Sequence, residues 1–417
     1  MMFFGRSIVV SIFVYQMIFL SLVPKTVFAF FQDGIPFAGF KLHSQINVTE
    51  SYTDNLLQDD DNKINTWKTF INPNVSLSKT YGLNQVEFGY GLLHSNYSAK
   101  GRDNITDHKF HLNSALDFNT SHRLKLSAQY NIMYEERGKD YSIGYGDLLK
   151  KPTEYKSLTA KSLYTYGAKS AKANVDVSLG YYEVLWEKLS ISDLTIGPPT
   201  DTSLIDLTAD REHEITSVGS TFRYKTGAYT EVNTSITYQD INYHHATGLV
   251  DNRDSEVSSA FVGLKWQGSA LTTGFVNVGY SSKTFDSQYR SDESGFRWQL
   301  GVIWKPLTYS NFDFSSAQNV TEAKGQGSYI KNTNYTVSWH HQWLTRLKTK
   351  LSTRVMNDEY GDSFREDDVD IYSATVTYQM RKNLAFSSSL KHHIRDSNIE
   401  KLTFTENIIS VSMKFAL

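Results

Sequence analysis

The stretch LKLSAQYNIMY, residues 124–134, decides the fold because apolar and mainly polar side chains alternate along it without a break. A period of two places the two sets on opposite faces of a β-strand. Residues 109–118 alternate in the same way, and Thr120-Ser121 lies between the two segments as a tight turn. The pair is therefore predicted to form a β-hairpin.

The pattern recurs along the chain, for example at residues 296–305, and we count about eighteen such segments from Phe40 to Leu417. Strands of a soluble β-sandwich average about 5–6 residues, which is shorter than these segments. Strands that cross a bilayer take about 9–11 residues and continue into loops. The prediction is an all-β fold, a transmembrane antiparallel β-barrel of about 18 strands.

Connections are predicted to alternate between eight tight turns and nine long polar loops, so that both ends of the barrel domain lie on the periplasmic side. The tight turns are expected near residues 80–84, 119–122, 167–171, 225–228, 267–270, 306–309, 343–346 and 381–383. The long extracellular loops are expected near residues 55–63, 98–105, 137–153, 188–211, 244–254, 286–292, 320–327, 361–368 and 397–402.

Aromatic residues recur where strands approach the tight turns, as expected of a girdle at the membrane interface. They are Phe118, Tyr166, Tyr224, Trp266, Trp304, Trp343, Tyr378 and Phe415. The last strand alternates up to Leu417 and is expected to pair with the first. Pro73 interrupts the second segment, where we expect a bulge or bend because proline donates no backbone hydrogen bond.

The N-terminus reads as a signal peptide over residues 1–29, followed by the barrel at 30–417. Arg6 precedes an apolar run of residues 8–23, and Val27-Phe28-Ala29 ends in a small residue. The alternative, a membrane-anchoring helix, needs about 20 apolar residues, more than this run offers. Export, 14% aromatic residues, no cysteine and a mean hydropathy of -0.40 together favour the bacterial outer membrane.

Composition and motifs argue against several other functions. A net charge of -2 gives no support to a nucleic-acid partner. No catalytic, cofactor or metal-binding motif is present. Histidine pairs occur at 244–245, 340–341 and 392–393, and adjacent side chains on a strand face opposite ways, so only one of each pair could line a shared site. We therefore predict neither an enzyme nor a cofactor or metal site.

The alternation predicts that basic side chains line the lumen and outnumber the acids Glu87, Asp117 and Glu135. Lys and Arg in a pore favour anions. The alternative is that these charges only solvate the channel wall. The predicted basic lining residues include Lys109, Arg123, Lys125, Lys161, Arg297, Lys348, Lys350, Arg354, Lys391 and Arg395.

Two acidic clusters are assigned to extracellular loops. One is Asp59, Asp60 and Asp61, and the other includes Asp362, Glu366, Asp367 and Asp368. Solvated loops are the simplest interpretation. Alternatives are bridging of divalent cations to surface lipid phosphates and a gate that pairs with the basic lumen residues.

Three segments resemble a known family: Glu50-Ser-Tyr-Thr-Asp-Asn55, Asn72-Pro-Asn-Val-Ser-Leu77 and Leu83-Asn-Gln-Val-Glu-Phe-Gly-Tyr90. The chain resembles outer-membrane β-barrels of the "barrel porin 2" type, most clearly from about Ser44 to Arg137. The resemblance implies a role in the production of exopolysaccharide or capsule. Composition and periodicity do not show that role.

The leading hypothesis is an outer-membrane conduit that exports an exopolysaccharide, with the basic lumen guiding an anionic chain. The alternatives are a diffusion porin, general or substrate-specific, and a surface barrel that anchors polysaccharide. The expected partners are outer-membrane lipid and lipopolysaccharide, the polysaccharide chain, and periplasmic export or synthesis proteins.

Overall fold

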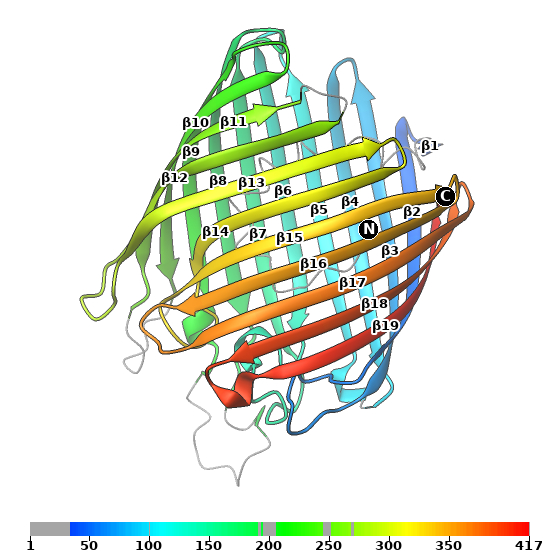
Figure 1. Ribbon diagram of the computed structural model, residues 1–417, viewed down its shortest axis with the longest axis vertical. Coiled ribbons are helices and arrows are strands. Elements are labelled where there is room, and N and C mark those ends of the chain that lie inside the picture. Colours follow the sequence, from blue (N-terminus) through cyan, green and yellow to red (C-terminus); the bar gives the residue numbers. More distant parts are fainter. Residues whose placement is uncertain are drawn as a thin grey trace.

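The computed structural model describes residues 34–99, 101–190, 193–194, 206–244, 252–267 and 271–416. Within these ranges, eighteen long antiparallel strands, β2 to β19, form one sheet that closes on itself (Figure 1). Closure comes from β19 and β2, where Ile408–Ala416 pairs with Gln45–Thr53, so neither strand is left as an open edge. The predicted barrel is confirmed. The expected signal peptide at 1–29 and Leu417 lie outside the described residues.

Each long strand pairs with its two sequence neighbours apart from the closing pair. Their bounds are β2 (Phe40–Thr53), β3 (Thr66–Tyr81), β4 (Asn84–Tyr97), β5 (Ile105–Asp117), β6 (His122–Glu135), β7 (Thr153–Tyr166), β8 (Ala173–Trp186), β9 (His213–Lys225), β10 (Thr230–Tyr243), β11 (Ser255–Trp266), β12 (Thr272–Phe285), β13 (Glu293–Leu307), β14 (Ser310–Glu322), β15 (Tyr329–Leu344), β16 (Leu347–Tyr360), β17 (Glu366–Arg381), β18 (Leu384–Ser397) and β19 (Phe404–Ala416).

The remaining elements are short. Strand β1 (Ile35–Phe37) pairs with the start of β2. In the described parts of the connections there are four single turns of 3-10 helix: η3 (Gly101–Asp103), η4 (Asp140–Ser142), η6 (Ala209–Arg211) and η7 (Glu400–Leu402). No helix in the described ranges is long and apolar enough to cross a membrane.

One end of the barrel carries the tight turns and the other the long loops, as the sequence predicts. At the turn end, Gly82 has a φ of 59°, a left-handed conformation that glycine adopts without strain. The side chain of Asn119 accepts hydrogen bonds from the backbone N–H groups of Ser121 and His122 at 2.8 and 2.9 Å. This side chain replaces a backbone turn hydrogen bond, which explains the short connection between β5 and β6.

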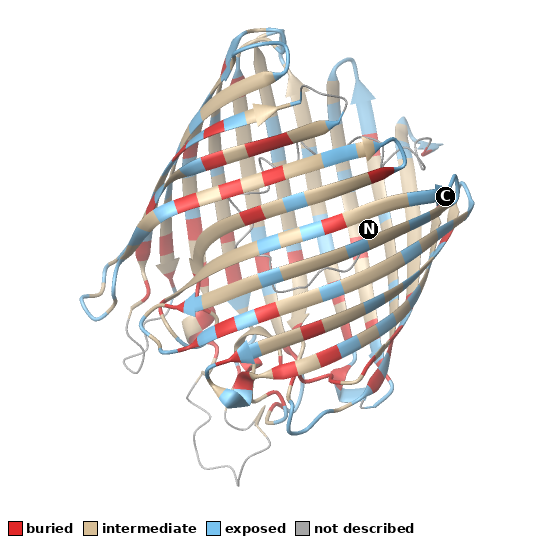
Figure 2. Ribbon diagram, viewed as in Figure 1, coloured by how far each residue is buried: buried red, intermediate tan, exposed pale blue. Residues whose placement is uncertain are grey.

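The two faces of the sheet differ in chemistry. One face carries exposed apolar residues such as Ile236, Leu390 and Val411, each between 50% and 60% exposed, and Figure 2 shows the alternation along the strands. On the other face the Tyr243 hydroxyl of β10 donates to Glu322 of β14 at 2.7 Å. Contact between strands that are not neighbours marks this second face as the concave interior, so the apolar face points outward.

The predicted aromatic girdle lies on the outer face at the turn end. All eight of its residues share the parity of the outward apolar residues, and Phe118, Tyr166, Trp304 and Trp343 are each at least 43% exposed. This arrangement matches the membrane-interface preference of aromatic rings.

A bulge or bend was predicted at Pro73, and the register excludes the bulge. Ile71 pairs with His94 and Asn74 with Gly91, so the β3–β4 register is the same on both sides of the proline and only residues 72 and 73 are unpaired. The Asn72 side-chain amide donates to the carbonyl of Leu92 at 2.6 Å. This side chain supplies a hydrogen bond to the strand opposite the proline, so the register survives without an inserted residue.

Candidate functional site

The ten basic residues predicted to line the lumen all lie on the inner face. Each has outward-facing neighbours in its own strand. For example, Lys109 precedes the exposed Phe110, and Lys391 follows the exposed Leu390. The structure therefore places all ten on the side of the wall that faces the lumen.

Seven of these residues form two groups, which we call the β5–β7 ladder (Lys109, Lys125 and Lys161) and the β16–β18 ladder (Lys348, Lys350, Arg354 and Lys391). Strands β6 and β16 are ten strands apart in chain order. In the other direction, through the closing pair of β2 and β19, they are eight strands apart. The two ladders therefore lie on nearly opposite walls. Lys109, Lys125 and Lys348 are exposed within the lumen.

The wall around the ladders is lined with hydroxyl and amide groups. Lys161 lies opposite Ser127, Lys109 opposite Asn131, and Lys391 opposite Ser373. Ser51 and Ser410 of the closing strands share a hydrogen bond at 2.8 Å. Such a surface offers donors and acceptors to a hydroxyl-rich solute without apolar contacts.

Arg123, Arg297 and Arg395 complete the set of ten predicted basic residues. Arg123 donates to the Gly167 carbonyl and to Asn174 near the turn end. The others pair with carboxylates: Arg297 with Glu293, and Arg395 with Asp367 at 3.7 Å. The contacts of Arg123 join β6 to β8 and its preceding turn, and the pair of Arg395 joins β18 to β17, whereas the pair of Arg297 with Glu293 lies within β13 itself.

The three acids predicted to oppose the basic residues are also on the inner face, and each lies close to a basic side chain. Glu87 lies 3.2 Å from His111, Asp117 lies 2.7 Å from Lys169, and Glu135 lies 3.4 Å from Arg211. These three acids are therefore partnered locally at the wall.

The residues assigned to acidic loops divide into different environments. Asp59, Asp60 and Asp61 lie in the β2–β3 loop and Asp362 in the β16–β17 loop, whereas Glu366, Asp367 and Asp368 belong to β17 itself. The Asp367 carboxylate is buried on the inner face and accepts from Arg365 and from Ser397. Glu366 and Asp368 face outward and both accept from Asn357 at 3.0 Å.

Asp362 joins three loops at the loop end of the barrel. It accepts hydrogen bonds from the backbone of Ser291 at 3.0 Å and from the Ser328 hydroxyl. Burial works against the charged form, but the bonds from Ser291 and Ser328 outweigh it and lower the pKa of Asp362 below its usual value. This carboxylate stays ionised in the ordinary pH range.

The connection between β6 and β7 was predicted only as a long loop, but its residues contact distant parts of the barrel. We call residues 136–152 the mouth loop. Lys139 lies 3.8 Å from Glu406 of β19, and Asp140 lies 2.9 Å from Lys324 in the β14–β15 connection. Since β14 is eight strands from β6, the mouth loop spans the lumen at the loop end and narrows it.

A buried arginine fixes the base of the mouth loop. Arg137 is 1% exposed in its side chain and donates to both oxygens of Asp103, at 2.6 and 2.8 Å. It also donates to the Gly146 carbonyl at 2.9 Å. A bidentate buried pair of this kind fixes both position and orientation.

Close packing against a neighbouring loop requires glycine in the mouth loop. Gly138 has a φ of 77°, and a Cβ there would lie 2.1 Å from the carbonyl oxygen of Leu57. The three glycines at 138, 144 and 146 were the sequence signal for this inserted loop. Sequence reasoning missed it because glycine is equally common in solvated loops.

Aromatic and charged side chains pack together behind the mouth loop. The Tyr141 ring lies 5.3 Å from the ring of Trp186, edge to face, and the Arg211 guanidinium lies 4.5 Å from the Tyr141 centroid. Burial raises the pKa of Tyr141, and the nearby Arg253 and Arg211 only partly oppose that shift. The Tyr141 hydroxyl is therefore neutral and serves packing.

Comparison with known proteins places this architecture among outer-membrane barrels. The family model described as "Putative beta-barrel porin 2" matches residues 29–417. No functionally curated protein matches the chain. Among solved structures, the outer membrane protein OpdK from Pseudomonas aeruginosa superposes with a TM-score of 0.50 at 10% identity, covering 90% of this chain and 99% of OpdK.

A second solved structure, the copper transporter OprC, covers 92% of this chain and 81% of its own, with a TM-score of 0.49 and 10% identity. At 10% identity the likeness to OpdK shows the fold alone.

Proposed function

This chain belongs to the putative beta-barrel porin 2 family of the bacterial outer membrane, and from this membership we propose that it conducts an anionic exopolysaccharide out of the cell. Its architecture is that of a porin-type transport barrel. In the outer membrane the tight-turn end is periplasmic and the loop end extracellular. Residues at the turn end would meet the periplasmic export or synthesis proteins that deliver the chain.

The observation that carries the proposal is the pair of basic ladders on facing walls of a hydroxyl-rich lumen. An extended acidic polysaccharide presents carboxylates along its length and hydroxyl groups on every sugar. The ladders would attract the carboxylates over the length of the channel, because charged residues lining a pore select the opposite charge. Serine, threonine and asparagine would exchange hydrogen bonds with the sugar hydroxyls.

Passage also requires that no single contact holds the chain too tightly, since conduction needs binding weak enough for release. Lys109, Lys125 and Lys348 are exposed within the lumen, where water screens their attraction. A series of screened contacts therefore suits a moving chain better than one buried site.

A second candidate, a diffusion porin for small anions, is favoured by the mouth loop. Ion pairs hold this loop across the lumen, at 3.8 Å on one side and 2.9 Å on the other. If the mouth loop stays in place during transport, the opening would pass small solutes and exclude a polysaccharide.

Deletion of the gene separates these functions, with polysaccharide quantified in the medium, on the cell surface and in the periplasm. The export proposal predicts loss outside the cell with accumulation in the periplasm, restored by the wild-type gene. Unchanged amounts in all three fractions would overturn it and leave the diffusion porin. Normal synthesis with shedding from the surface would instead indicate an anchoring barrel.

A further inference from the structure

The outer face of the barrel is acidic near its extracellular end. Outward-facing carboxylates occupy half of the eighteen long strands there, while the bases on the same face, among the described strand residues of this end, are Lys156 and Lys331. The acids are Glu50, Glu154, Glu183, Glu214, Asp240, Glu256, Glu359, Glu366, Asp368, Asp370 and Asp396. A negative surface of this kind favours bound cations.

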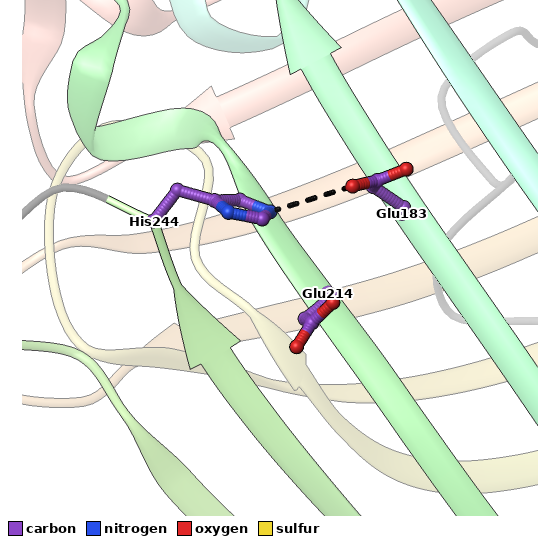
Figure 3. Close-up of side chains that lie close together, drawn as sticks. All are labelled: Glu183, Glu214 and His244. Atoms are coloured by element: carbon purple, nitrogen blue, oxygen red, sulfur yellow. Dashed lines mark ion pairs between the residues drawn. The ribbon is translucent and has the colours of Figure 1, made fainter.

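Three potential metal ligands converge in this acidic region, from three consecutive strands. Glu183 comes from β8, Glu214 from β9, and His244 directly follows the end of β10 (Figure 3). Each offers one ligand atom, and the three atoms lie within 4.8 Å of one another. The His244 Nε2 atom lies 3.9 Å from a carboxylate oxygen of Glu183.

The register of the sheet brings like charges together in this cluster, which destabilises it unless a cation is bound. Glu183 and Glu214 are direct cross-strand partners, and like charges in that position repel each other. Tyr181 donates to one oxygen of Glu214 at 2.9 Å, which satisfies one hydrogen bond but adds no positive charge. Among the described residues no lysine or arginine forms an ion pair with either glutamate. A bound cation would offset the repulsion that the sequence places in this register.

From this convergence and the repulsion we infer that Glu183, Glu214 and His244 bind a divalent cation of the zinc class on the outer wall of the barrel. Imidazole nitrogen suits zinc and related first-row metals, whereas calcium and magnesium prefer oxygen ligands alone. Two carboxylates and one imidazole supply three ligands and leave a position for water or an outside donor.

The geometry needs only a small adjustment to close on the metal. Ligand atoms about 2.0–2.2 Å from a tetrahedral zinc lie roughly 3.4 Å from one another. The observed separations of up to 4.8 Å exceed this by an amount that rotation of partly exposed side chains can supply. The site would tie the extracellular ends of β8, β9 and β10 together.

Zinc titration of the purified barrel in detergent, followed calorimetrically, tests the inference. The wild type is expected to bind one zinc ion, and both Glu183→Gln and His244→Asn to weaken binding at least about tenfold. Glu154→Gln is the matched control, since Glu154 also faces outward at the extracellular end, on β7, and it should bind zinc as the wild type does. Calcium is titrated in parallel, and the wild type should bind it far more weakly than zinc.

No zinc binding by the wild type, or equal binding by the His244→Asn and wild-type barrels, would overturn the inference. Calcium binding equal to zinc binding would also overturn it, because it would indicate a general cation atmosphere on the acidic face. A difference in gel migration between heated and unheated samples verifies that each variant is folded. His244 is exposed and lies outside the strand, so its variant remains informative if a glutamate variant fails to fold.

Discussion

The mouth loop and the basic ladders place charge in the lumen in two different ways. Arg137 of the mouth loop is 1% exposed and bonded to both oxygens of Asp103. Lys125 and Lys348 of the ladders lie exposed within the lumen. A buried charge with a fixed partner holds a structure together, whereas an exposed charge on a channel wall remains able to interact with a solute. The comparison gives the first region an architectural role, and under the proposed function the second region contacts the transported solute.

The largest stability effect is expected from breaking the buried pair at the base of the mouth loop. Arg137→Ala leaves the Asp103 carboxylate buried without its partner, which costs about 3–5 kcal/mol. Unfolding in denaturant, with limited proteolysis at residues 136–152, measures the loss and its location.

The matched control for this pair is Lys169→Ala. Lys169 pairs with Asp117 at 2.7 Å but is 69% exposed, so its loss should cost at most about 1 kcal/mol. If the two variants unfold alike, burial does not distinguish the mouth loop from the other ion pairs.

The next effect tests the assignment of inner and outer faces, on which the comparison depends. Leu390 is 55% exposed at the middle of β18 and faces outward, so Leu390→Arg places a charge in lipid at a cost of about 2–4 kcal/mol. Ser389→Arg, one position away, faces the aqueous lumen and should cost little. If Ser389→Arg were the less stable variant in lipid bilayers, the inner and outer faces would be assigned the wrong way round.

How far the sequence alone leads can be judged from these same residues. The period of two placed Leu390 outward and Lys391 inward correctly, because a sheet buried on one side in lipid requires that alternation. The sequence did not predict which basic residues pair with carboxylates of the wall. The partner of Arg395, for example, is Asp367, a residue that the sequence had suggested for a loop. The mouth loop was also missed, because its contacts with Glu406 and Lys324 join residues far apart in the chain.

Charge reversal in the β16–β18 ladder is expected to change the ion selectivity of the channel with little change in the stability of the barrel. Lys348→Glu combined with Lys350→Glu reverses two charges on one wall and should shift the reversal potential of the channel in a salt gradient toward cation selectivity. Lys382→Glu, in the β17–β18 turn at the periplasmic end, serves as the control and should shift it far less. Equal shifts would show that the ladders do not set selectivity.

The smallest effect concerns the pH dependence of the loops at Asp362. Because its pKa is lowered in the folded barrel, Asp362 stabilises the loops above its unfolded pKa of about 3.9. That contribution is lost as the pH falls through the folded value. Protease resistance of the loops should therefore drop in strong acid, and Asp362→Asn should show reduced resistance at neutral pH with a weaker pH dependence. An acid response unchanged by the substitution would refute this role.

The most direct test of the central claim is the recording of single channels in planar bilayers. Anionic and neutral oligosaccharides of equal length are added on the periplasmic side. If the facing ladders guide an acidic chain, the anionic oligosaccharide will interrupt the current at far lower concentration than the neutral one, and the double reversal at Lys348 and Lys350 will weaken that difference. Equal block by both oligosaccharides in the wild-type channel would contradict the account.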